Sequence, residues 1–274
     1  MKPAQRLIIL LLLLLLVGLP APAEEDPGLW QRFLDWREER ISRTDSYQVV
    51  LNGPGYAAIQ DLRMSPRIYR GPGFVAFAQL RDFRPRETVL QTLFFQFAYP
   101  LTEETISGDR SYNNPRGTVD LTYLRRIGDL PLQVGGGVSG GGNLRTLSSL
   151  ANSAFNYDIS VSANASARWQ EDFSLFGRDA EWHAQLSVPL FSWVQRMPAY
   201  NISYAGPATT WAFPWDFYRL RINLGLSRLL KRSEENRFSI DYLYDFYGMS
   251  EPKRQERLTL GNHALVFGYA LKTK

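Results

Sequence analysis

The clearest pattern in the chain is a strict alternation of apolar and polar residues. Between positions 155 and 169 the odd positions are apolar and the even positions are polar or charged. Successive side chains of a β-strand point to opposite faces, so this pattern predicts a strand with one apolar and one polar face. It lasts longer than the roughly 5–6 residues of an average strand, and long enough for a tilted strand to cross a bilayer in about 9–11 residues.

The same alternation recurs along the rest of the chain and predicts about ten strands. Strong examples cover 181–190, 218–227, 237–246 and 265–271. Weaker ones cover 73–83, 88–99, 117–126, 130–141 and 199–205, and 47–62 could add two more. Counting strands from the two ends places the turn at 127–129 on opposite sides of the sheet, so one strand between 130 and 205 is missed or wrongly joined.

These strands favour a membrane-spanning barrel over a soluble sheet. In hydrocarbon every backbone N–H and C=O must be paired within the protein, and only helices and closed sheets achieve this. Aromatic residues near the predicted strand ends suit the two membrane interfaces: Trp169, Trp182, Trp193, Trp215, Tyr218 and Tyr269. We therefore predict an all-β fold, an antiparallel transmembrane β-barrel of about 10–12 strands, with a soluble periplasmic barrel or sandwich as the alternative.

The N-terminus carries the features of an export signal. Lys2 and Arg6 precede an apolar run over 7–19, and Ala21-Pro22-Ala23 supplies a small-residue cleavage site. The run is short for a membrane helix, which needs about 20 residues, so we predict a signal peptide over 1–23 rather than an uncleaved anchor.

A short amphipathic helix is expected between the signal and the barrel. Within the segment 24–46, apolar residues follow helical spacing over 27–41, and Asp26 and Pro27 suit its first turn. An apolar stripe of this kind usually packs on other structure, here the barrel mouth, and a plug or a partner-binding helix is the alternative. The barrel itself is expected over 47–274.

Composition narrows the chemistry that the chain can perform. It has no cysteine, so disulfides and thiolate chemistry are excluded, and with His183 and His263 as its two histidines a multi-histidine metal site is nearly excluded. The mean hydropathy of −0.26 is too polar for a bundle of membrane helices but suits a barrel. The formal charge of +4 includes Lys2 and Arg6 of the signal, so the mature chain is nearly neutral and gives no reason to expect nucleic acid.

The polar faces of the strong strands carry both signs of charge. Buried charges must pair or meet water, and a barrel near eight strands is filled by its own side chains. We therefore expect an internal lattice of ion pairs and a closed or very narrow lumen. The predicted lumen residues are Asp158, Arg168, Glu181, His183, Arg219, Arg221, Arg237, Asp241 and Asp245.

One constellation resembles catalytic machinery. Glu181, His183 and Ser187 share the polar face of one predicted strand, where a serine, a histidine and an acid could be combined. A lumen histidine paired with a carboxylate explains the same residues more simply. The glycines at 135–137 and 140–142 lack the Gly-Lys-Ser/Thr ending of a phosphate loop. We expect no catalytic residue, no cofactor and no metal.

Two segments resemble a known family. The stretch from Gly55-Tyr56 through Asp61 to Gly71 contains Asp-x-x-x-Ser-Pro-x-x-Tyr-x-Gly, and 187–191 with 197–204 is similar to a second recurrent segment. Both resemble an uncharacterised outer-membrane barrel family of Bacteroidetes-type bacteria, a domain of unknown function. The resemblance implies an outer-membrane barrel and assigns no activity.

Three functions follow from this sequence, in order of preference. The first is an integral outer-membrane barrel without catalytic activity, structural or binding a ligand or partner through the loops at 100–116 and 206–216. The second is a narrow channel or transporter, whose lumen Arg168, Arg219 and Arg221 would make favourable to anions. The third is a hydrolase. Expected partners are outer-membrane lipids and the barrel-assembly machinery.

Overall fold

The structure is a computed structural model. It describes residues 45–62, 64–84, 86–98, 101–103, 111–147, 155–196, 208–230, 235–251 and 256–273. The predicted signal peptide (1–23) and amphipathic helix (27–41) lie outside the described residues. Within the described ranges, no helix has the length and apolar character needed to cross a membrane.

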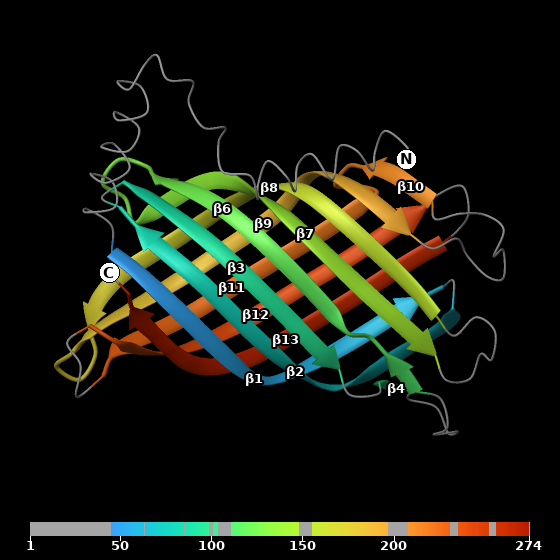
Figure 1. Ribbon diagram of the computed structural model, residues 1–274, viewed down its shortest axis with the longest axis horizontal. Helices are drawn as coiled ribbons and strands as arrows, with labels where there is room; N and C mark the ends of the chain where they lie inside the picture. The colour runs from blue at the N-terminus through green and yellow to red at the C-terminus, as the bar shows by residue number, and fades with distance from the viewer. Residues whose placement is uncertain are drawn as a thin grey trace, which may run out of the picture. The chain divides into compact units, whose positions relative to one another are not determined.

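The described part of the chain forms a closed antiparallel β-barrel (Figure 1). Each long strand pairs with the next long strand, and β1 pairs with β13, with Val49 opposite Ala270, to close the ring. The ten long strands are β1 (Asp45–Asp61), β2 (Ser65–Phe83), β3 (Glu87–Ala98), β6 (Arg116–Arg126), β7 (Leu132–Leu147), β8 (Phe155–Ser174), β9 (Asp179–Arg196), β11 (Phe217–Leu229), β12 (Arg237–Glu251) and β13 (Glu256–Lys272). The predicted fold class is therefore confirmed, with ten strands in the ring.

Three short strands extend the wall at the end remote from Asp45. Strand β4 (Leu101–Glu103) pairs with β2, and β5 (Ser111–Asn113) pairs with both β4 and β7. Strand β10 (Ala208–Ala212) pairs with β9 beyond the part of β9 that β11 covers. Strand β4 continues the direction of β3, β5 that of β6, and β10 that of β11. Each of these three wall strands is therefore interrupted and divided into a long and a short part.

The ring resolves the conflict in the strand count. Residues 47–61 belong to one strand, β1, which also includes Asp45 and Ser46 from the predicted N-terminal segment. Strand β9 pairs directly with β11, and the ring closes with ten long strands among the described residues. The predicted strand at 199–205 lies outside the described residues. The connection at 127–131 then lies at the same end of the barrel as Asp45 and Lys272.

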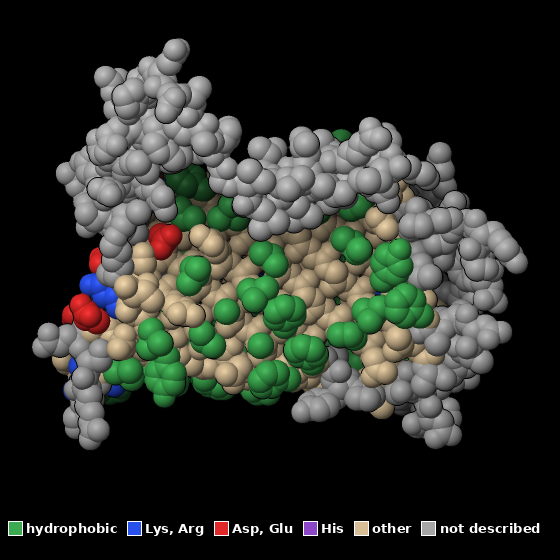
Figure 2. Space-filling model, viewed as in Figure 1, with side chains coloured by type: hydrophobic (Ala, Val, Ile, Leu, Met, Phe, Trp, Pro, Cys, Tyr) green, Lys and Arg blue, Asp and Glu red, His purple; other side chains and the backbone are tan. Residues whose placement is uncertain are grey.

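The outer wall of the barrel is apolar, whereas the interior holds polar and charged side chains together with buried apolar ones. Figure 2 shows hydrophobic side chains spread over the visible wall and charged ones gathered at one end. Trp182 and Tyr269 are exposed near the end that holds Asp45 and Lys272, and Trp211 and Trp215 near the other. This arrangement suits a wall in contact with acyl chains between two aromatic interfaces, so the strands span a membrane.

A bulge changes which side chains of β9 face the lumen. The register shifts at Ala163 and Asn164 of β8, leaving Leu190 of β9 out of the pairing and exposed on the outer wall. Before the bulge the odd positions of β9, such as His183, are buried. After it the even positions, such as Arg196, are buried.

Close packing of β7 against β6 gives a first prediction. A Cβ added at Gly137 would overlap the backbone carbonyl of Leu121, whereas a Cβ at Gly140 would meet nothing within 4 Å. We expect Gly137→Leu to destabilise the barrel by at least about 2 kcal/mol through overpacking, and Gly140→Leu to fold as the wild type. Urea unfolding of both variants in detergent checks this, and equal midpoints would contradict it.

Candidate functional site

Charged side chains fill the lumen in three groups that follow one another along the barrel axis. We name them the upper, central and lower clusters, with the lower cluster nearest the end that holds Asp45 and Lys272. Strand β8 gives the order, because Asp158 of the upper cluster, Asn164 beside the central cluster and Arg168 of the lower cluster follow one another along it.

The upper cluster is a neutral and fully buried set of two arginines and two carboxylates. Arg145 contacts Asp158 at 2.9 Å and Asp61 at 3.3 Å, and Arg196 Nε donates to Asp158 Oδ1 at 3.0 Å. The Tyr247 hydroxyl donates to the other Asp158 oxygen at 3.1 Å. Asp158 therefore joins three strands, β7, β9 and β12, to its own strand β8.

Apolar side chains surround the upper cluster inside the barrel. They come from ten of the strands around the wall, and the Tyr69 and Tyr112 rings lie 5.2 Å apart. The members are Ala57, Ile59, Met64, Tyr69, Leu101, Tyr112, Leu147, Val194, Ala212, Phe217, Tyr247, Met249, Leu258 and Leu260. We call this set the apolar cap. It fills the lumen at the end remote from Asp45 and Lys272.

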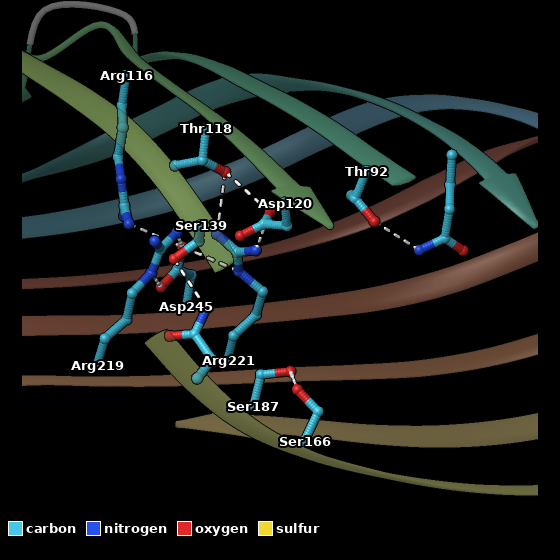
Figure 3. Close-up of polar contacts among 12 residues, drawn as sticks. Thr92, Arg116, Thr118, Asp120, Ser139, Ser166, Ser187, Arg219, Arg221 and Asp245 are labelled. Carbon is cyan, nitrogen blue, oxygen red and sulfur yellow. Dashed lines mark hydrogen bonds and ion pairs between the residues drawn. The ribbon is translucent and has the colours of Figure 1, made fainter. Parts of the chain in front are cut away.

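The central cluster gathers three arginines around two aspartates (Figure 3). Asp245 accepts two bonds from Arg219, at 3.0 and 2.8 Å, and contacts Arg116 at 2.9 Å. Arg221 lies 3.7 Å from Asp245, pairs with Asp120 and donates to Thr118 at 3.0 Å. With three cations and two anions, this cluster carries one excess positive charge.

A cavity of about 50 Å³ adjoins the central cluster. Arg219, Arg221 and Asn223 line it from β11, and Asn164 and Ser187 line it from β8 and β9. Its other walls include more hydroxyl and amide groups and the apolar side chains of Phe77, Phe94 and Leu243. Since about 10–15 Å³ of such space holds one water, the cavity has room for a few waters or one small solute.

The lower cluster is centred on Glu181 and Asp241. Glu181 contacts Arg168 at 3.5 Å and Arg237 at 3.0 Å. Asp241 contacts Arg81 at 3.6 Å and accepts a hydrogen bond from Ser239 at 2.8 Å. These contacts join β2, β8, β9 and β12 across the lumen.

The predicted histidine lies between the two carboxylates of the lower cluster. His183 Nδ1 is 3.8 Å from Glu181 and Nε2 is 3.5 Å from Asp241, and the side chain is fully buried. Ser187 instead shares a hydrogen bond with Ser166 at 2.8 Å. A nucleophile needs its base within hydrogen-bond reach, and the contacts of both side chains go elsewhere. The structure therefore does not combine Glu181, His183 and Ser187 into a catalytic set.

The predicted lumen residues fall into all three clusters. Asp158 lies in the upper cluster, and Arg219, Arg221 and Asp245 lie in the central one. The lower cluster contains Arg168, Glu181, His183, Arg237 and Asp241. Among the described residues, no group of His, Asp and Glu has the arrangement of a metal site.

Six cluster members escaped the sequence analysis: Asp61, Arg81, Arg116, Asp120, Arg145 and Arg196. Glycines blur the alternation of β7 before Arg145, and the bulge at Leu190 moves Arg196 to the inner face. Extending the polar positions of β7 from Ser139 through Asn143 to Arg145 would have found one of them.

Comparison with known proteins gives weak structural likenesses only. No protein-family model matches the chain, and no curated protein matches its sequence. Solved structures of similar shape include the outer membrane protease OmpT from Escherichia coli, with a TM-score of 0.45, 6% identity, and coverage of 84% of this chain and 95% of that chain. The translocator domain of the autotransporter NalP from Neisseria meningitidis has a TM-score of 0.40, 11% identity, and coverage of 89% and 96%. The toluene transporter TbuX from Ralstonia pickettii has a TM-score of 0.30, 12% identity, and coverage of 82% and 72%. No functional argument rests on likenesses of this size.

The buried position of Asp158 gives a second prediction. Asp158→Asn leaves Arg145 and Arg196 in an apolar surrounding with much less compensating charge, so we expect the free energy of unfolding to fall by about 3 kcal/mol or more. Asp45→Asn is the control, because the Asp45–Lys272 pair at 3.3 Å is exposed and contributes little. Urea unfolding in detergent checks both variants. A smaller loss for Asp158→Asn than for Asp45→Asn would contradict the assignment.

Proposed function

We propose that the protein is an integral outer-membrane barrel without catalytic activity, whose lumen is closed to solute flow. The observation that carries this proposal is the filling of the lumen by the apolar cap and the buried upper cluster. A conducting pore needs a connected aqueous path, as in barrels of sixteen or more strands, whereas ten strands leave an interior that side chains can fill.

The position of the filling supports a permanent closure. Arg145 and Arg196 of the upper cluster are 0% and 1% exposed, and the apolar cap surrounds them. Opening a path there would separate buried ion pairs and wet apolar side chains at the same time. Both changes cost free energy, so a closed state is strongly favoured.

We further propose that the chain is exported by the signal peptide at 1–23, is inserted by the barrel-assembly machinery and resides in the outer membrane. The resemblance to an uncharacterised outer-membrane family is compatible with this location and adds no activity. Function would then reside in the long connections at 100–116 and 206–216, whose described parts lie at the end of the barrel remote from Asp45 and Lys272. Loops on a rigid scaffold commonly carry recognition.

Bilayer recordings test the closed lumen. We expect the purified protein in planar bilayers to show no steady open conductance in about 1 M potassium chloride, because the apolar cap and the upper cluster fill one end of the lumen. The protein recovered from the same preparation must be folded, which resistance to unfolding by detergent at room temperature verifies. Steady conductance steps that favour anions would instead support the narrow channel.

An esterase assay tests the absence of catalysis. We expect the wild type and His183→Ala to hydrolyse short-chain nitrophenyl esters at the same background rate, because Ser187 is bonded to Ser166 rather than to His183. Ser187→Ala serves as a second comparison. Activity above background that both substitutions abolish would support the hydrolase.

A further inference from the structure

The central cluster holds more positive charge than its own carboxylates neutralise. Arg116, Arg219 and Arg221 face Asp120 and Asp245, and the side chains of Arg116, Asp120 and Asp245 are less than a tenth exposed. A charge removed from water is costly unless an opposite charge or a solvent molecule meets it. The excess charge therefore needs a partner beyond these five side chains.

Hydrogen-bond donors are also in excess at this point. Each guanidinium has five N–H donors, and the two carboxylates accept only part of the fifteen that the three arginines bring. Arg116 Nη1 is buried without a hydrogen-bond partner in the structure. Arg219 and Arg221, by contrast, border the cavity directly. Any species in the cavity therefore lies beside two arginine side chains.

The remaining cavity wall suits an oxyanion or a halide. Asn164, Gln185 and Asn223 carry amide N–H groups, and Ser139 and Ser187 carry hydroxyl groups that can turn toward an acceptor. Asp120 and Asp245 also line the cavity, but Arg219 bonds both oxygens of Asp245 and Arg221 pairs with one oxygen of Asp120. The volume of about 50 Å³ limits the occupant to a few heavy atoms.

We propose that this cavity is a binding site for one small monovalent anion, of the size of chloride, nitrate or formate, held between Arg219 and Arg221. The anion neutralises the excess charge of the central cluster. The site depends only on the geometry of the lumen, so it is independent of whether the barrel conducts.

The test compares anions of different size on the full chain in detergent. The clusters above and below the cavity hinder the entry of anions into the folded barrel. The protein is therefore refolded from urea in the presence of chloride, nitrate or formate, and gluconate keeps the ionic strength constant. Gluconate is too large for the cavity. We expect the urea midpoint to rise saturably with each small anion and to be unaffected by gluconate, since binding to the folded state alone stabilises it.

Two substitutions locate the site. Arg219→Gln removes one cavity arginine while Asp245 keeps Arg116 and Arg221, and we expect the apparent anion affinity to fall at least tenfold. Arg219→Lys should restore part of it. The control, Arg196→Gln, removes a lumen arginine of the upper cluster whose Asp158 keeps Arg145, and it should leave the anion dependence unchanged.

A second pair of variants tests the same site in case Arg219→Gln does not fold. Asn223→Asp adds a negative charge to the cavity at constant size and should abolish the anion effect, whereas Asn156→Asp, beside Arg145 in the adjacent strand, should not. The proposal is overturned if the wild type shows no saturable anion effect, if gluconate acts like nitrate, or if cavity and control variants lose the effect equally.

Discussion

A bilayer core offers no hydrogen-bond partners, and that constraint acts on both the wall and the lumen of this protein. In the wall it requires every strand to have two neighbours, which the pairing of β1 with β13 completes. In the lumen it acts on side chains, because a ten-stranded barrel has little room for water. The charged residues that point inward must therefore find partners from other strands. The clusters around Asp158, Asp245 and Glu181 are the result, and each joins strands that lie far apart in the sequence.

These ion pairs specify the barrel as much as they stabilise it. A buried pair often contributes little compared with an apolar replacement, but breaking one partner away is costly. A slip of one residue in the register of β8 would turn Asp158 and Arg168 toward lipid and expose their partners. The charged lumen thus excludes alternative registers that the short, repetitive side chains of the segment 160–167 would otherwise permit.

Period-two alternation predicted the barrel and most strands, because the polarity of each side chain indicates whether it faces lipid or the lumen. It placed Asp158, His183 and Asp245 in the lumen for the same reason. The alternation does not show which charged residues of different strands contact each other. Arg145 and Asp61, for example, meet only because of the ring closure and the path of the short strands. It also failed where a backbone feature breaks the period, as at the bulge beside Leu190 that turns Arg196 inward.

The distribution of charge along the lumen follows the supply of compensating groups. The upper cluster, inside the apolar cap, contains equal numbers of arginines and carboxylates, and Arg145 and Arg196 are almost fully buried. Excess positive charge is found only farther along the axis, where the side chains of Arg221 and Arg237 are 22% and 19% exposed. Charged side chains buried away from water must balance one another. Where space lies beside an arginine, water or an anion can instead supply the missing partner. The neutral upper cluster inside the apolar cap and the excess positive charge of the central cluster therefore follow from the same requirement. The cavity beside Arg219 is the place where a ligand can supply the missing negative charge.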